Sequence, residues 1–218
     1  MPKLAFLHLG CLQRIPFVPD LDRLPNLKRL TLALLHSVTA FPSFDGLVRI
    51  EQIQIIDAIR VTTLPSIAHL HNLKLVVVAA RNPLCCNGFW NGDCDLTDFS
   101  CRDRTARGEP RVECTSERMS NADHKIIVDY PVCVKEAYEI DLADTVVTRE
   151  SSDGVCGGVK YKQCELDGIP GICFPSRMMV IACERYTAYE TLRRVQIERN
   201  IGEPCDPVVE QWLGCQHK

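Results

Sequence analysis

Apolar residues recur at an interval of 23 residues through the first third of the chain. Each repeat has the spacing apolar-x-x-apolar-x-apolar, and a proline follows in the return arm at positions 19, 42 and 65. A fixed period of this kind is typical of repeat proteins, in which each unit packs on its neighbours. We therefore expect a solenoid over residues 1–82. The anchor residues are Leu4, Leu7 and Leu9, then Leu27, Leu30 and Leu32, then Ile50, Ile53 and Ile55, then Leu73, Val76 and Val78.

The repeated segments resemble leucine-rich repeats, because an L-x-x-L-x-L segment leads into a return arm with a proline turn. The resemblance implies an α/β leucine-rich-repeat solenoid of about four repeats, each with a short parallel strand on the concave side. Such repeats usually place an asparagine where the chain leaves the strand, and here those positions hold Leu12, Leu35 and Ala58. We expect degenerate repeats whose buried backbone groups find other partners.

The residues between the anchors are expected to point out of the core and to form a binding surface on the concave side. Soluble proteins rarely expose a contiguous apolar patch, so Leu75 and Val77 leave two alternatives. Either the cysteine-rich segment that follows covers them, or they contact a partner. The candidate contact residues are Phe6, His8, Arg29, Thr31, Gln52, Gln54, Ile56, Leu75 and Val77.

Twelve of the thirteen cysteines lie after the repeats, and only Cys11 lies within them. This even number predicts up to six disulfides in an oxidising compartment, with Cys11 as the free thiol, although spacing does not give the pairing. A zinc protein is the alternative, but the sequence contains no C-x-x-C pair, and four of the six histidines lie in the repeats. The disulfide candidates are Cys85, Cys86, Cys94, Cys101, Cys114, Cys133, Cys156, Cys164, Cys173, Cys183, Cys205 and Cys215.

The N-terminal residues do not form a secretory signal, because the first anchor leucine follows Met1 within three residues. No apolar run approaches the roughly 20 residues needed to cross a bilayer. Together with the expected disulfides, this predicts an extracellular or cell-surface protein that is either the C-terminal piece of a longer chain or a truncated sequence. The net charge of −3 predicts no nucleic-acid binding.

The repeat pattern stops at Asn82, where Pro83 turns the chain away. We expect a disulfide-rich α+β module over residues 83–218. Apolar runs predict strands at 126–128 and 132–134, and a buried strand or helix start at 178–183. Helix formers predict helices over 135–147, 186–199 and 207–213, and the charged stretch 102–113 predicts a surface loop.

Three aspartates in the string NGDCDLTDFSC form a candidate calcium site, since calcium prefers oxygen ligands. Asp93, Asp95 and Asp98 lack the spacing and the closing glutamate of the twelve-residue calcium loop, so a solvated acidic turn is the alternative. Cys183 with His124 or His217 would supply a thiol nucleophile and its base, but nothing in the local sequence supports such a pair. We therefore expect no metal, no cofactor and no catalysis.

The C-terminal third carries the strings GGVKYKQCELDGIPGICFPSRMMVIAC and LRRVQIERNIGEPCDPVVEQWLGC. Together with NPLCCNGFWNGDC, they resemble the C-terminal part of oomycete leucine-rich-repeat proteins with a cysteine-rich WLGC domain, a family named for its terminal Trp-Leu-Gly-Cys motif. The resemblance implies a surface or secreted orientation and brings no catalytic residue. It also implies membrane attachment only through a segment upstream of this chain.

The sequence therefore predicts a non-catalytic module for protein interaction or ligand recognition. Its expected partner is an unknown protein or glycan, bound on the concave face. Two alternatives remain open. One is an enzyme or inhibitor in the cysteine-rich module, with the repeats as a platform, and the other is a non-functional truncated product.

Overall fold

The computed structural model describes residues 3–127, 133–134, 154–176, 180–185 and 187–216. The chain divides into two compact units, Met1–Glu139 and Ile140–Lys218, which we call the repeat unit and the C-terminal unit. The domain boundary predicted after Asn82 falls inside the repeat unit, which therefore also contains the first cysteines. No helix in the described ranges is long and apolar enough to span a bilayer.

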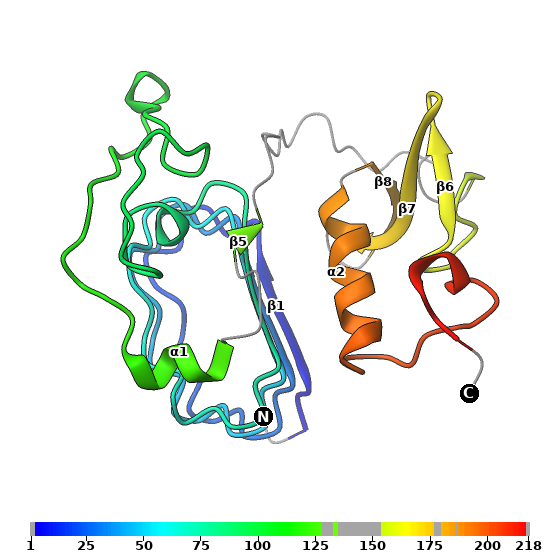
Figure 1. Ribbon diagram of the computed structural model, residues 1–218, viewed down its shortest axis with the longest axis horizontal. Helices are drawn as coiled ribbons and strands as arrows, with labels where there is room; N and C mark the ends of the chain where they lie inside the picture. The colour runs from blue at the N-terminus through cyan, green and yellow to red at the C-terminus, as the bar shows by residue number, and fades with distance from the viewer. Residues whose placement is uncertain (1–2, 128–132, 135–153, 177–179, 186, 217–218) are drawn as a thin grey trace. The chain divides into compact units, whose positions relative to one another are not determined.

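Parallel strands form the sheet of the repeat unit (Figure 1). Neighbouring strands from β1 to β4 pair residues that are 23 apart in sequence, such as Phe6 with Arg29 and Arg29 with Gln52. The result is a solenoid-like stack of about three turns, which confirms the predicted repeat architecture at this level. In sheet order the strands are β1 (Phe6–Gly10), β2 (Arg29–Ala33), β3 (Gln52–Ile56), β4 (Leu75–Ala79) and β5 (Cys133–Val134).

The anchor residues of the inner repeats form the core of this unit. Leu30, Ile53 and Val78 are each at most 1% exposed. The anchors of the first repeat are only partly buried, because β1 lies at the edge of the sheet. The apolar period thus determines which side chains face inward, and burying them drives the stacking.

A residue with left-handed backbone follows each of the first four strands. Its φ angle lies between 53° and 58°, a conformation that residues other than glycine rarely adopt. At the first three of these positions the backbone N–H donates to the last strand residue of the next repeat, as from Leu34 to the carbonyl of Ile56 at 2.9 Å. These bonds pair backbone groups without the asparagine ladder that the repeats lack. The left-handed residues are Cys11, Leu34, Asp57 and Ala80.

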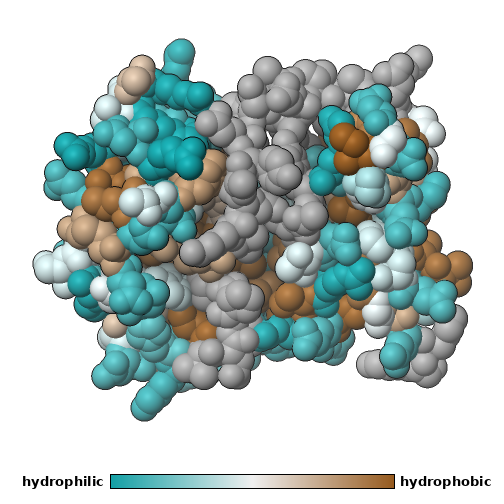
Figure 2. Space-filling view, turned by 45° about the horizontal axis from the view of Figure 1, so that its top comes forward, coloured by the Kyte–Doolittle hydropathy of each residue, from teal (hydrophilic) through white to brown (hydrophobic). Residues whose placement is uncertain are grey.

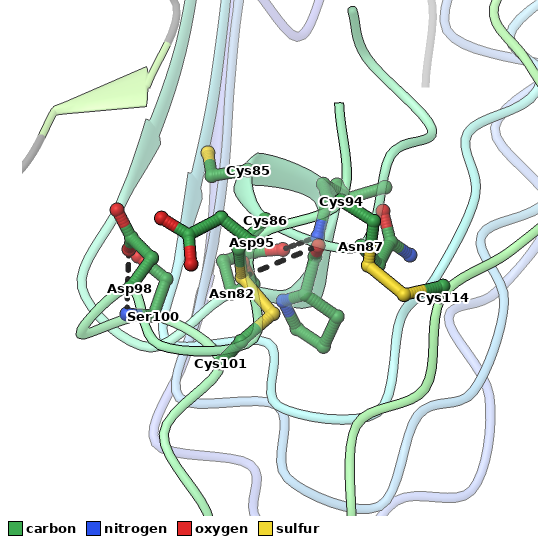
Figure 3. Close-up of a disulfide and its surroundings, with 12 residues drawn as sticks. Asn82, Cys85, Cys86, Asn87, Cys94, Asp95, Asp98, Ser100, Cys101 and Cys114 are labelled. Atoms are coloured by element: carbon green, nitrogen blue, oxygen red, sulfur yellow. Dashed lines mark hydrogen bonds between the residues drawn. A yellow bond between two sulfur atoms is a disulfide. The ribbon is translucent and has the colours of Figure 1, made fainter. Parts of the chain in front are cut away.

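Two 3₁₀ turns and a helix follow the repeats. Asn82 caps η1 (Pro83–Cys85) by accepting a hydrogen bond from the N–H of Leu84. The predicted charged loop contains η2 (Thr105–Arg107). Three disulfides staple this segment, and two of them are drawn in full in Figure 3.

The strand predicted over residues 126–128 is wrong where the structure describes it, because Ile126 and Ile127 end the helix α1 (Asn121–Ile127). Ser120 caps this helix: the N–H of Asp123 donates to its Oγ at 3.1 Å. An N-cap of this kind favours a helix, and it outweighs the β-propensity of the two isoleucines. Of the strand predicted over 132–134, residues 133–134 form β5.

The C-terminal unit has an antiparallel sheet with strand order β6-β7-β8. The helix predicted over 186–199 is confirmed as α2, and the described part of the segment 178–183 lies in β8. The helix predicted over 207–213 reduces to the turn η5, and the one predicted over 135–147 lies outside the described residues. The elements are β6 (Gln163–Leu166), β7 (Ile169–Ser176), β8 (Val180–Glu184), α2 (Thr187–Glu198) and η5 (Gln211–Leu213).

The two faces of this sheet differ chemically. One face carries a buried sulfur cluster that includes Cys173 and Cys183, tied by two disulfides. The other face carries Ile172, which packs in a second cluster with Tyr161 and Leu213. Side chains alternate between the faces of a strand, so neighbouring residues of β7 contribute to different clusters.

Candidate recognition surface

An exposed aromatic ring and a guanidinium lie together on the first two strands. Phe6 is 57% exposed, and Cζ of Arg29 lies 4.7 Å from the centroid of its ring. The two residues are opposite each other in the β1–β2 register, which places them on one face of the sheet. Among the described residues, no carboxylate forms an ion pair with Arg29.

Polar side chains continue this face toward β3. The hydroxyl of Thr31 donates to Oε1 of Gln54 at 2.9 Å. His8 is exposed beside Thr31, and its ring lies over Gly10, where any Cβ would collide with His8 Nε2. Partial removal of the ring from water lowers the pKa of His8 below its usual value. Half-buried Ile56 ends β3.

Three predicted contact residues are buried, which corrects the surface expected from the sequence. Gln52 is 0% exposed, Leu75 is 4% exposed and Val77 is 8% exposed. Gln52 lies on the central strand of the sheet, and β4 is not the last strand, because β5 pairs beside it. This burial argues against an exposed apolar patch at Leu75 and Val77.

The remaining residues define what we call the strand surface. It combines one aromatic ring, one guanidinium that forms no ion pair with a described carboxylate, and polar groups. In the view of Figure 2, hydrophobic areas are broken up by hydrophilic side chains over both units. Single exposed apolar groups of this kind suit a reversible contact better than a permanent one. The strand surface consists of Phe6, His8, Arg29, Thr31, Gln54 and Ile56.

A buried ion cluster joins three repeats where the strands end. Asp57 is 1% exposed; its Oδ2 lies 2.7 Å from His36 Nε2, and its two oxygens accept hydrogen bonds from Arg81 at 2.8 and 3.0 Å. Arg81 also pairs with Glu109 of the segment after the repeats. Burial alone would raise the pKa of Asp57, but the hydrogen bonds from His36 and Arg81 outweigh it and hold that pKa below its usual value.

This cluster was not predicted from the sequence. A signal was present, because Asp57 occupies the left-handed position of the third repeat, and Arg81 follows 24 residues later, in the next repeat. Stacked repeats bring such positions together. The cluster's internal pairing indicates a structural role.

A second buried carboxylate attaches α1 to the third return arm. Oδ1 of Asp123 accepts hydrogen bonds from Ser66 Oγ and from the backbone N–H groups of Ile67 and Ala68, all at 2.7–2.8 Å. Burial would raise the pKa of Asp123, but these donors and the Ser120 hydroxyl hold it below the usual value. The helix thereby supports the end of the solenoid.

Two of the three aspartates of the candidate calcium site accept hydrogen bonds within their own turns. Asp95 accepts from the N–H and the hydroxyl of Thr97. Asp98 accepts from the N–H of Ser100 at 2.9 Å (Figure 3). Asp93 is exposed, and its N–H donates to a neighbouring asparagine. The described residues contain no group of three carboxylates whose oxygens converge. The geometry fits the solvated turn rather than a calcium site.

All thirteen cysteines are described, and twelve of them form six disulfides, with Cys11 as an exposed free thiol. Cys183 is bonded to Cys164, so it is not a nucleophile. One group of three possible metal ligands occurs among the described residues, but it consists of disulfide sulfurs. Each disulfide lies within one unit. The pairs are Cys85–Cys133, Cys86–Cys101, Cys94–Cys114, Cys156–Cys173, Cys164–Cys183 and Cys205–Cys215.

A buried arginine organises the C-terminal unit. Arg193 of α2 is 1% exposed and donates two hydrogen bonds to Glu210, at 2.6 and 3.0 Å. Its Cζ lies 4.0 Å from the centroid of the Tyr161 ring. A bidentate pair stacked on an aromatic ring has a defined geometry, so it fixes α2 against the C-terminal loop.

The last structural turn closes this unit through four consecutive residues. Trp212 Nε1 donates to the carbonyl of Tyr161 at 3.0 Å, and Leu213 is 3% exposed in the apolar cluster. Gly214 has a φ of 95°, which glycine adopts without steric cost, and Cys215 is disulfide-bonded. These residues end the segment 151–216, which matches the WLGC domain family.

The chain contains a WLGC domain.

The WLGC domain covers less than a third of the 218 residues. Its name-giving motif forms a hydrogen bond, a core contact, a left-handed turn and a covalent link, so the motif is structural in this chain. No curated protein and no solved structure matches the chain.

Proposed function

We propose that this chain is a non-catalytic recognition module of a cell-surface or secreted leucine-rich-repeat protein, which binds a protein or glycan through its strand surface. The observation that carries the proposal is the exposed ring of Phe6 beside the guanidinium of Arg29, which forms no ion pair with the carboxylates that the structure describes. Aromatic residues and arginine are enriched at protein interfaces and supply much of their binding energy.

The regular backbone supports this proposal. Parallel strands in a fixed register hold the side chains of the strand surface at constant spacing. Little conformational entropy is then lost when a partner binds, because the scaffold is already ordered. The apolar period and the parallel register also support assignment of the solenoid to the leucine-rich-repeat class.

Disulfide content supports a location outside the reducing cytosol. Six disulfides in 218 residues are common in secreted and surface proteins and rare in cytosolic ones.

The titratable groups of the described residues fit binding better than catalysis. His36 next to Asp57 has the composition of a catalytic pair, yet both oxygens of Asp57 also accept from Arg81. Ion-pair networks of this kind commonly stabilise structure and shift pKa values without catalytic use.

The test has two stages. The disulfide-intact chain is first screened against arrays of extracellular proteins and glycans. The affinity of each ligand found is then measured for Phe6→Ala and Arg29→Ala. We expect each variant to bind about tenfold more weakly, because truncating a central aromatic or arginine residue often costs that much.

Matched controls lie away from the strand surface. Phe17, 68% exposed in a return arm, is the control for Phe6, and exposed Arg60 is the control for Arg29. Phe17→Ala and Arg60→Ala should retain full affinity. Undiminished binding by the Phe6→Ala, Arg29→Ala double variant would refute this assignment of the surface.

A further inference from the structure

Residues 109–115 form an open segment of the repeat unit, between the turn η2 and the helix α1. The chain makes no turn or bend over these residues, so its backbone runs extended. In the described part of the chain, the backbone groups of residues 110–113 form no hydrogen bond with other backbone groups. An extended segment of this kind can pair through its main chain with a strand of a partner protein.

Both ends of this segment are anchored to the rest of the repeat unit. At the first end, Glu109 pairs with Arg81, which follows the fourth strand. At the other end, Cys114 forms a disulfide with Cys94, and the N–H of the residue that follows donates to the carbonyl of Asn87 at 2.9 Å (Figure 3). The segment is therefore held extended before a partner binds, which lowers the conformational entropy lost on binding.

Arg111 is the exposed side chain in the middle of the segment, between half-buried Pro110 and Val112. No ion pair joins its guanidinium to a carboxylate in the part of the chain that the structure describes. Exposed Asp103 is close enough to interact with its charge, but both side chains are open to solvent. Arg111 is thus presented to a partner on an extended, anchored backbone.

Two other exposed arginines near this segment are held differently. Arg107 lies in η2, where the backbone is helical and the N–H of Gly108 donates to the carbonyl of Thr105 at 2.9 Å. Arg118 is exposed, but its guanidinium donates to two backbone carbonyls. These residues provide matched controls, because they have the charge of Arg111 without its presentation.

We propose that residues 109–115 form the binding loop of an inhibitor of trypsin-like serine proteases, with Arg111 in the specificity pocket of the enzyme. Such proteases bind a positively charged side chain over an aspartate at the base of that pocket. The loop shares no residue with the strand surface, so this function is additional to recognition by the repeats.

The anchors explain why the loop inhibits the enzyme instead of being consumed by it. The serine hydroxyl of the protease adds to the carbonyl carbon of Arg111, the bond to Val112 breaks, and the histidine of the enzyme gives its proton to the new amine. Val112 lies two residues before the disulfide-bonded Cys114, so the amine stays beside the acyl-enzyme. It attacks the ester, re-forms the peptide bond and releases the serine hydroxyl, because proximity favours this reaction over attack by water.

Two disulfides also connect the chain before the cleaved bond to the chain after it. They are Cys94–Cys114 and Cys85–Cys133. A chain cleaved after Arg111 therefore remains one covalent molecule, and its new ends cannot diffuse apart.

The test titrates the amidolytic activity of trypsin with the full disulfide-intact chain. We expect saturable inhibition, which Arg111→Ala should weaken at least about 100-fold, because the side chain in the specificity pocket dominates such an interface. Arg107→Ala should inhibit as well as the parent chain. Arg111→Phe should lose inhibition of trypsin and gain inhibition of chymotrypsin, a result that a misfolded variant would not give.

A second measurement tests the anchors. Intact mass after incubation with trypsin reports cleavage after Arg111, and Glu109→Gln should make this cleavage about threefold to fivefold faster by weakening the pair with Arg81. Glu113→Gln, an exposed change in the same segment, should cleave at the parent rate. Absence of inhibition, rapid cleavage after Arg111 without inhibition, or equal inhibition by Arg111→Ala and the parent would overturn the proposal.

Discussion

The repeat unit and the C-terminal unit reach stability by different routes. One continuous apolar cluster extends from Val18 in the first repeat to Ile127 in α1. The described residues of the C-terminal unit form two small clusters instead, and one of them consists largely of disulfide sulfur. A small unit buries too little apolar surface to be stable by that means alone, so covalent links and buried polar pairs contribute more of its stability.

Buried charges serve the two units differently as well. Asp57 joins neighbouring repeats at the end of the stack of strands, where hydrophobic contacts already define the register. Arg193 is the largest fully buried side chain among the described residues, and it links elements that no repeating pattern aligns. Removing the buried charge should therefore lower the free energy of unfolding more in the C-terminal unit than in the repeat unit.

Each unit contains one of the two tryptophans, Trp90 in the repeat unit and Trp212 in the C-terminal unit. Chains labelled with 5-fluorotryptophan would report the unfolding of the two units separately by ¹⁹F NMR. With this assay, the effect of a point substitution on the stability of each unit can be measured separately.

The largest effect is expected for Arg193→Met. Removing the guanidinium leaves Glu210 buried without its partner, which costs about 4 kcal/mol of unfolding free energy. Urea titration followed at Trp212 should show this loss, with the Trp90 transition unchanged. Arg194→Met is the control, because its pair with Glu190 is solvent-exposed and should contribute little. Similar losses in both variants would contradict a special role for the buried pair.

Asp57→Ala should destabilise the repeat unit by about 3 kcal/mol, since Arg81 and His36 lose the carboxylate that they share. The urea transition at Trp90 measures this change. Asp45, 78% exposed and 3.5 Å from a histidine, provides the comparison: Asp45→Ala should stay close to the parent protein. Equal stability of the Asp57 variant and the parent would show that apolar stacking alone holds the repeats.

Acid should weaken the repeat unit below about pH 4, near the usual pKa of an aspartate. Asp57 and Asp123 have lowered pKa values in the folded state, so their stabilisation is present above the unfolded pKa and is lost as the pH falls through the folded one. Urea midpoints followed at Trp90 between pH 2 and 7 measure the slope of stability against pH. Asp57→Asn should make this slope smaller; an unchanged slope would assign the acid response to other groups.

The smallest effect is expected for Trp212→Phe. This change keeps an aromatic ring but removes the hydrogen bond to Tyr161, which is worth about 1 kcal/mol. Hydrogen exchange in α2 measures the loss, because the reporter itself is replaced. Trp90→Phe should leave exchange in α2 unchanged. An unaltered C-terminal unit in Trp212→Phe would mean that the indole N–H is not needed for the WLGC fold.

The sequence predicts the structural features that follow from its repeat period or from local sequence signals. The strands and their register follow from the spacing of anchors such as Leu30 and Ile53, because only one register buries every anchor. The helix α2 is similarly local, ending just before Gly202 and Pro204. The strand surface was predicted in part for the same reason, since alternation along β1 and β2 places Phe6 and Arg29 on one face.

Features that depend on contacts between distant segments were not predicted. Cysteine spacing does not reveal which cysteines pair, such as Cys85 with Cys133. The ion cluster of Asp57 needs residues from separate repeats and from the segment that follows them. Ile126 was assigned to a strand by its β-propensity, whereas the Ser120 cap decides for a helix.

Hydrogen exchange with and without reductant tests the central comparison most directly, because it reports local stability along the whole chain. Reduction removes three disulfides from each unit. Amides of β6, β7, β8 and α2 should then lose their protection, while those of β2 and β3 keep most of theirs. Equal loss in both units, or a C-terminal unit that stays protected after reduction, would contradict the account.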